Sequence, residues 1–228
     1  ERDESYAIEF TIGSGTGISI AFWIYFPTLG AQEFNFTSHD NDSNYAGYWI
    51  YKDPNNNILF NWGPGTAGTS SSGRETRKGD TILSVNTWYF VVATSDFVHS
   101  TATGHNIYIN GIAETISIDG SANVSTPGYI SGTTGKIGGE IFSDDSYGEF
   151  NMKNIAIWDE ILDANDISAL YNNGNYISFG SNSGGYDKAG DLQMHMDFTL
   201  GSEDDLIETI DDGNTVLTNG AAIVNTGT

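Results

Sequence analysis

The sequence predicts an all-β sandwich with one short helix near residues 163–173. Most apolar segments alternate with a period of two, which is typical of strands that present one side to a core. One segment in the second half departs from this period, because Ile167, Leu170 and Tyr171 recur at helical spacing. The composition agrees, since 28 glycines and 13% aromatic residues suit many strands joined by turns. A lone helix in an otherwise strand-like chain is therefore the expected architecture.

The N-terminal half predicts five strands separated by polar turns. Their ranges are 5–12, 18–26, 33–38, 45–52 and 58–62. In the second of these, Ile and Phe occupy one face while Trp23 and Tyr25 occupy the other, so we expect a central strand covered on both sides. The run Asp53-Pro-Asn-Asn-Asn57 predicts a hairpin turn. Residues 63–79 are rich in Gly, Thr and Ser without apolar periodicity, which predicts a long loop.

The rest of the chain continues the pattern. Further strands are predicted at 81–85, 87–95, 106–110, 112–118 and 155–158. Asp163 and Asp166 have the spacing of an acidic capping box at the start of the helix, and Gly174 suits its C-terminal cap. Residues 178–190 are rich in Gly, Ser and Asn and predict a linker to an alternating C-terminal segment. The length suits a single domain spanning 1–228.

Four segments occur in an order that carries a family resemblance. They are an aromatic strand at Gly17–Pro27, the run Trp-Tyr-Phe-Val-Val-Ala within Asn86–Thr94, the hairpin Asn-Ile-Tyr-Ile-Asn-Gly at Asn106–Gly111, and the strand and helix of Gly148–Gly174. Together they resemble laminin G-like domains of the concanavalin A-like lectin/glucanase superfamily over roughly residues 5–175. The resemblance implies a jelly-roll β-sandwich, a C-terminal strand segment that packs back on it, and a lectin-like or adhesive role. The alternative for that segment is a connection to a neighbouring module.

The charge balance limits the partners of this chain. Its 8 basic and 30 acidic residues give a net charge of -22, which repels phosphate backbones, so we expect no nucleic-acid partner. No apolar run is long enough to insert into a membrane, no signal peptide is visible, and there is no cysteine for a disulfide. We expect an extracellular, cell-surface or virion location. The acidic, lysine-poor composition suits a marine microbial or phage surface protein.

Carbohydrate sites combine flat aromatic rings with polar side chains that bind hydroxyl groups. The candidate carbohydrate-binding residues lie in or beside segments rich in Asp and Asn, and they are Tyr45, Trp49, Trp62 and Tyr147. For Trp49 and Trp62, a place in the core of their strands is an equal alternative. The other three tryptophans, Trp23, Trp88 and Trp158, are expected to be core residues.

Calcium is the cofactor that the sequence predicts. This ion takes roughly six to eight oxygen ligands, and two polar loops are dense in carboxylates. The candidate ligands in these loops are Asp40, Asp42, Asp144 and Asp145. The competing explanation is that Asp and Asn simply favour turns. Lys153 stands where the resembled family carries an acid before its late strand, so a metal that used this acid would be lost or moved.

One acidic run has the spacing of a glucanase active site. It is Glu203-Asp-Asp-Leu-Ile-Glu208, but it lies in the tail rather than on an aromatic core strand, so we predict no catalytic residues and no enzyme. The sequence predicts a non-catalytic lectin-like carbohydrate-binding or adhesion module of an extracellular or virion surface protein. Its expected partners are a glycan or polysaccharide and other chains of a surface or virion assembly. The alternatives are a glycoside hydrolase or polysaccharide lyase on the same fold, and a ligand-free structural or decoration domain.

Overall fold

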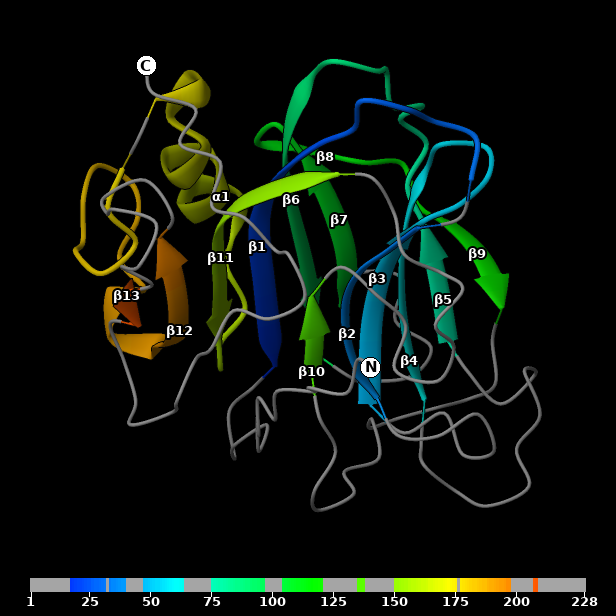
Figure 1. The fold of residues 1–228 in the computed structure, drawn as a ribbon. Helices are drawn as coiled ribbons and strands as arrows, with labels where there is room; N and C mark the ends of the chain where they lie inside the picture. Colours follow the sequence, from blue (N-terminus) through cyan, green and yellow to red (C-terminus); the bar gives the residue numbers. More distant parts are fainter. Residues whose placement is uncertain are drawn as a thin grey trace, which may run out of the picture.

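The computed structural model describes residues 17–31, 33–39, 47–63, 75–96, 104–120, 135–137, 150–175, 177–197 and 207–208. Two antiparallel β-sheets pack face to face, and an α-helix lies against the outer side of one of them (Figure 1). For this part of the chain the predicted fold class, an all-β sandwich with a short helix near residues 163–173, is confirmed. The predicted strand 5–12 lies outside the described residues.

Counted over the described residues, one sheet has seven strands in the order β13-β12-β11-β1-β6-β7-β8 and the other has six in the order β10-β2-β3-β4-β5-β9. The strands of the seven-stranded sheet are β1 (Ile18–Tyr25), β6 (Trp88–Ser95), β7 (His105–Ile109), β8 (Ile112–Ala113), β11 (Asn151–Trp158), β12 (Leu192–Asp197) and β13 (Ile207–Glu208). The strands of the six-stranded sheet are β2 (Glu33–His39), β3 (Gly47–Lys52), β4 (Ile58–Gly63), β5 (Glu75–Lys78), β9 (Ser117–Gly120) and β10 (Gly135–Ile137). β1 pairs with β6 on one side and with the distant β11 on the other, so long-range pairing builds the centre of this sheet.

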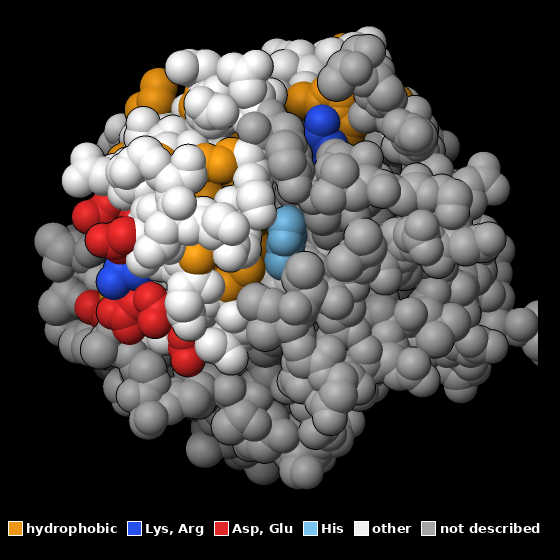
Figure 2. Space-filling view, turned by 90° about the vertical axis from the view of Figure 1, so that its left-hand side faces the viewer, with side chains coloured by type: hydrophobic (Ala, Val, Ile, Leu, Met, Phe, Trp, Pro, Cys, Tyr) orange, Lys and Arg blue, Asp and Glu red, His pale blue; other side chains and the backbone are white. Residues whose placement is uncertain are grey.

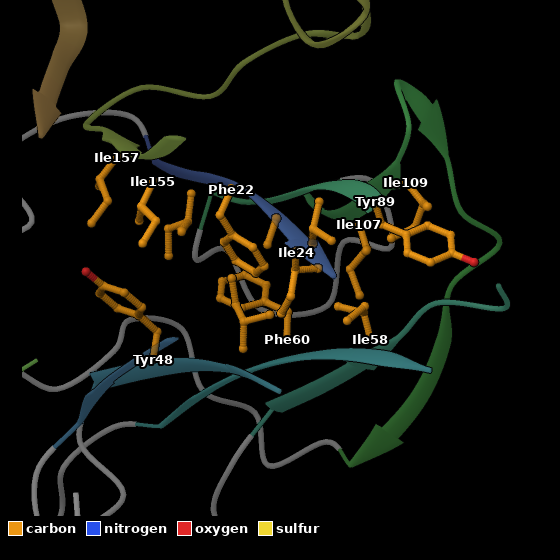
Figure 3. Packing of buried hydrophobic residues seen from close by; sticks show 14 of the residues in the cluster. Phe22, Ile24, Tyr48, Ile58, Phe60, Tyr89, Ile107, Ile109, Ile155 and Ile157 are labelled. Atoms are coloured by element: carbon orange, nitrogen blue, oxygen red, sulfur yellow. The ribbon is translucent and has the colours of Figure 1, made fainter. Parts of the chain in front are cut away.

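The core lies between the two sheets (Figure 3). Phe22 and Ile24 of β1 point from the seven-stranded sheet toward Ile58 and Phe60 of β4, and all four side chains are at most 2% exposed. The period of two explains this arrangement, because alternate residues of each strand face the partner sheet. Ile155 of β11 joins the same layer, as its buried-strand pattern predicted.

A second apolar layer covers the outer face of the seven-stranded sheet. Helix α1 (Ala164–Tyr171) contributes Ile167 and Leu170 to this layer, which also contains Phe90 of β6 and Trp158 of β11. These four side chains are at most 1% exposed. In the half of β1, β6 and β11 that α1 covers, both faces are therefore buried, which explains the apolar residues on both faces there.

Hydrogen bonds at Asp163 and Asp166 fix the start of the helix. The Asp163 carboxylate accepts the backbone N–H groups of Asn165 (2.7 Å) and Asp166 (2.9 Å), and Asp166 accepts the N–H of Asp163 (3.0 Å). The predicted capping box is confirmed. The other oxygen of Asp166 accepts the N–H of Asp187 at 3.1 Å, so the same carboxylate also holds the segment that follows. The helix leads into a 3-10 turn, η2 (Asn172–Gly174).

The segment after the helix packs on the outer layer. Phe179 and Tyr186 are each 1% exposed, although they fall within residues 178–190, which the sequence predicts as a linker. The Tyr186 hydroxyl donates to the Phe179 carbonyl (2.7 Å) and accepts the Trp158 indole N–H (2.9 Å). Burial raises the pKa of Tyr186 to about 12. After the turn η3 (Ala189–Asp191), β12 pairs with β11 and extends the sheet.

Figure 2 shows the face of the molecule that carries α1 and β12. Apolar side chains appear there in small separate patches among polar atoms, and acidic side chains gather at one side. Small patches need no partner to cover them. Among the described residues in this view, the acidic side chains are therefore unevenly spread.

The prediction of a loop over residues 63–79 is wrong for β5. This strand contains no apolar residue, so its sequence lacks the usual signal of a buried strand. Glu75 and Arg77 nevertheless lie beside Trp62 and Phe60 on the inner face of the sheet, as an ion pair of 2.8 Å. Their exposed fractions are 0% and 3%. The ion pair therefore allows a strand without apolar residues to have a buried inner face.

The prediction of a strand over residues 81–85 is also wrong. Leu83 and Val85 would share a face in a strand, but Leu83 is 3% exposed and Val85 is 45% exposed. The segment is held instead by side chains from elsewhere in the chain. The amide of Asn57 donates to the carbonyls of Gly79 and Thr81, both at 3.1 Å. An irregular backbone with these partners needs no sheet.

Candidate functional site

A partly exposed group of aromatic side chains lies on the outer face of the seven-stranded sheet. The register places Asn151, Tyr25 and Trp88 in one row across β11, β1 and β6, and it places Lys153, Trp23 and Phe90 in the next row. These residues alternate with the core residues of the same strands, so they face away from the other sheet. We call Trp23, Tyr25, Asn86, Trp88 and Lys153 the outer aromatic surface.

Ring contacts and one hydrogen bond hold the aromatic residues in place. The centroids of Tyr25 and Trp88 are 5.5 Å apart, and those of Trp23 and Phe90 are 5.2 Å apart. The Tyr25 hydroxyl donates to Asn86 Oδ1 at 2.8 Å. Tyr25 and Trp88 are partly exposed and Asn86 is exposed, whereas Trp23 is 9% exposed. Trp23 therefore forms the base of the surface, and Tyr25 and Trp88 present ring area to solvent.

Lys153 extends over two of these rings. Its Nζ lies 4.6 Å from the Trp88 centroid and 5.6 Å from the Trp23 centroid, within the range of cation–π attraction. The pairing of β1 with β11 shifts register next to this position, and Asn154 adopts a left-handed φ of 49°. Such a bulge re-aims neighbouring side chains. Burial lowers the pKa of the Lys153 ammonium.

The predicted carbohydrate residues that the structure describes are both buried. Trp62 is 0% exposed and lies in the core between the sheets. Trp49 is 2% exposed and packs with Tyr51 and Leu59 on the opposite face of the six-stranded sheet. Neither presents a ring to solvent, because the alternation of β3 and β4 directs them into packed layers. The prediction that Trp88 is a core residue also differs from the structure, which leaves it partly exposed.

The remaining predicted site residues lie outside the described residues, and they are Tyr45, Tyr147, Asp40, Asp42, Asp144 and Asp145. Among the residues that are described, no group of three or more His, Cys, Asp or Glu comes together in a way that suits a metal ion. In the same part of the chain, no helix has the length and apolar character needed to cross a membrane.

The structure joins a Ser, a His and an Asp that the sequence does not connect. Ser95 Oγ lies 2.7 Å from His105 Nδ1, and His105 Nε2 lies 3.7 Å from Asp96 Oδ1. Ser95 and His105 are each 0% exposed, and the imidazole lies against Trp62 with centroids 4.2 Å apart. A catalytic nucleophile must reach a substrate, so this geometry favours a polar network inside the core.

Asp80 and Glu114 form a carboxyl pair joined by a hydrogen bond. Glu114 accepts the backbone N–H of Thr81 (2.6 Å) and its hydroxyl (2.8 Å), and Asp80 accepts the N–H of Thr115 (3.1 Å). The pair thus ties the irregular segment after β5 to the segment before β9. Burial raises the pKa of the Glu114 carboxyl; the hydrogen bonds from Thr81 oppose this, and Asp80 adds to the increase.

The Glu114→Gln variant is expected to gain stability relative to the parent chain as pH rises. A carboxyl whose pKa is raised by folding contributes stability below its ordinary pKa and loses it as pH rises through the raised value. The amide has no such loss, and it removes the repulsion with Asp80. We expect a relative gain of less than about 1 kcal/mol between pH 4 and pH 7, since the site is only partly buried. Urea unfolding at both pH values measures it, and a constant difference would contradict the assignment.

A family model described as the Concanavalin A-like lectin/glucanases superfamily, of the laminin G type, matches residues 5–168. The chain belongs to this superfamily. The resemblance inferred from the ordered motifs in the sequence is therefore confirmed. A comparison with curated proteins gave no match.

Solved structures resemble this superfamily member at low sequence identity. The botulinum neurotoxin serotype D binding domain matches with a TM-score of 0.51 and 16% identity over 73% of this chain and 39% of that chain. The binding domain of botulinum neurotoxin DC, in complex with rat synaptotagmin II, has a TM-score of 0.50 and 20% identity over 74% and 38%. A structure of botulinum neurotoxin type C, a toxin whose cell entry is described as dependent on interaction with two ganglioside molecules, has a TM-score of 0.48 and 22% identity over 71% and 36%. The chain thus spans well under half the length of these toxin chains, and the first two matches support the fold alone.

Proposed function

We propose that this chain is a non-catalytic, lectin-like carbohydrate-binding module that holds its ligand on the outer aromatic surface. The observation that carries the proposal is the pair of partly exposed rings of Tyr25 and Trp88, with centroids 5.5 Å apart and an exposed amide beside them. Aromatic faces pack against the C–H groups of a sugar ring, and amides bind its hydroxyl groups. Membership of a superfamily that includes lectins supports the same class of ligand.

The surface is pre-organised for such a ligand. Tyr25 and Trp88 are neighbours in the β1–β6 register, and the hydrogen bond from Tyr25 to Asn86 orients the phenol ring. Side chains that are already ordered lose little conformational entropy when a ligand binds. The oxygen of Asn86 is engaged by Tyr25, so its amide nitrogen is the group that would donate to a sugar hydroxyl.

Hydrolysis is the alternative within the same superfamily, whose description includes glucanases. A retaining glycosidase needs two carboxyl groups about 5 Å apart on either side of the sugar bond. Asp80 and Glu114, a carboxyl pair among the described residues, interact directly with each other rather than across a bound sugar. This contact favours binding over catalysis. A module of this kind would work outside a cell or on a virion, next to other chains of a surface assembly.

Calcium would bind through Asp40, Asp42, Asp144 or Asp145 if the polar loops that contain them hold a metal. Carboxylate oxygens are the ligands this ion prefers, which is the support for keeping it in the proposal. The outer aromatic surface does not need the ion, because its described groups are rings, an amide and an ammonium. Binding through this surface should therefore persist in EDTA, while a loss of binding in EDTA would favour the loops as the site.

The Trp88→Ala variant tests the proposed function. We expect it to lose about 30-fold in affinity for a glycan that the parent chain binds, since truncation of a central aromatic contact costs about 2 kcal/mol or more. A glycan array identifies the glycan, and isothermal titration calorimetry measures the affinity with and without EDTA. Ile118→Ala is the matched control, because this residue of β9 is 60% exposed on the other sheet.

Three results would contradict parts of this proposal. Unchanged binding by the Trp88→Ala variant would place the glycan elsewhere on the chain. Absence of binding to any glycan would favour the ligand-free structural role. Turnover of laminarin, agar or alginate by the parent chain would establish the enzyme alternative.

A further inference from the structure

Lys153 differs from most other basic residues that the structure describes. Arg77 pairs with Glu75 at 2.8 Å, Lys78 pairs with Asp53 at 2.6 Å, and Lys52 donates to a backbone carbonyl. Lys153 instead lies over the rings of two tryptophans, and none of its contacts with described residues is an ion pair.

The position of the Lys153 ammonium over two rings favours the binding of an anion. Ring faces replace part of its water shell, so part of the desolvation cost of an ion pair is already met before a ligand arrives. The indole rings attract the cation but do not neutralise it. Within the described part of the chain, burial is what lowers the pKa of the Lys153 ammonium, and no described carboxylate contributes to that shift. An arriving negative group would thus meet an ammonium that pairs with no acid among the described residues.

The net charge of -22 does not remove this attraction. At physiological ionic strength, charges more than about 8 Å apart are largely screened, so the groups around the ligand decide its binding. The groups that line the outer aromatic surface carry one positive charge, at Lys153, together with neutral rings and the Asn86 amide. The five residues that define this surface therefore carry a charge opposite in sign to that of the whole chain.

We infer that the outer aromatic surface takes a saccharide that carries a negatively charged group, a carboxylate or a sulfate, which pairs with the Lys153 ammonium while the sugar ring packs on Tyr25 and Trp88. The inference rests on the proposed function and specifies the ligand class of the same site. A charge-assisted hydrogen bond to the ammonium supplies the preference for an acidic sugar. The rings supply affinity that acidic and neutral sugars share.

The test compares three oligosaccharides of equal length on the full chain, by calorimetry at physiological salt. They are a neutral laminari-oligosaccharide, a uronate oligosaccharide from alginate and a sulfated one from carrageenan. We expect at least one of the two acidic ligands to bind about tenfold more tightly than the neutral one. The ligand that does so distinguishes carboxylate from sulfate. Equal or tighter binding of the neutral ligand would overturn the inference but leave the proposed function intact, whereas no binding of any of the three would count against both.

Variants at one side chain separate charge from packing. Lys153→Gln is expected to lose about tenfold in affinity for the acidic ligand and to keep its affinity for the neutral one. Lys153→Arg retains the charge and should retain most of the preference, which also shows that the site tolerates substitution. Lys188→Gln removes an equal charge just before the turn η3, outside the outer aromatic surface, and should change nothing. A Lys153→Gln variant that binds the acidic ligand as well as the parent chain does would overturn the inference.

Discussion

The Glu75→Gln variant is expected to lose about 3 kcal/mol of its free energy of unfolding. Glu75 is 0% exposed, and its carboxylate pairs with the Arg77 guanidinium at 2.8 Å. The same guanidinium lies 5.3 Å from the centroid of Trp62, inside the core. Neutralising Glu75 leaves a buried cation without its counter-charge, and this cost exceeds the value of the pair itself. Urea unfolding at pH 7, followed by tryptophan fluorescence, measures the loss.

A double variant shows whether the unpaired charge causes that loss. Glu75→Gln combined with Arg77→Met removes both charges and leaves an unbranched apolar side chain against Trp62. We expect it to recover most of the stability, because replacing a buried pair by apolar groups is often close to neutral. An equally unstable double variant would show that the hydrogen bonds of Glu75, rather than the charge on Arg77, carry the effect.

The Phe179→Ala variant is expected to lose about 3–5 kcal/mol of its free energy of unfolding. Phe179 is 1% exposed, and its ring lies 5.7 Å from that of Trp158, 6.3 Å from that of Phe90 and 4.9 Å from that of His195. Truncation leaves a cavity among rings that belong to the sheet, so they cannot move far to fill it. The measurement is again urea unfolding, monitored by circular dichroism.

The exposed residue Ile118 provides the comparison for this variant. Ile118→Ala removes an apolar side chain that is 60% exposed, and we expect a change of less than about 0.5 kcal/mol. If Phe179→Ala also costs less than about 1 kcal/mol, the segment over residues 178–190 would unfold separately from the sandwich. A large loss in one cooperative transition would show that the segment stabilises the whole body.

Most of the sandwich is predictable from local patterns. Apolar periodicity correctly predicts which side chains are buried in three strands, β1, β4 and β6. The helical spacing of Ile167 and Leu170 does the same for α1. β5 cannot be predicted from apolar periodicity, because its inner face carries Glu75 and Arg77. These two residues are buried as an ion pair, which only the folded structure shows. The expected strand at 81–85 fails for the opposite reason. Its apolar residues are of the types found in strands, but side chains from distant segments form hydrogen bonds with its backbone groups in place of a neighbouring strand.

The residues of the outer aromatic surface are brought together by the pairing register of β1 with β6 and β11. This explains why the sequence alone does not predict the surface. Trp88 and Lys153 lie far apart in the chain and meet only because β6 and β11 flank β1. Trp88 sits in an apolar strand and so suggests a core residue, yet it belongs to the end of that strand. A bulge beside Asn154, which the sequence does not signal, sets the position of Lys153.

The strands at the margins of both sheets are short, which affects how molecules of this chain meet at high concentration. In the described part of the chain, β8 and β13 have two residues each, β10 has three and β9 has four. A long, flat margin exposes a row of backbone groups on which another chain can add a strand and begin a fibril. These margins give an incoming strand few consecutive groups to bond. Where these strands form the margin, contact between folded copies should therefore depend on side chains rather than on added strands.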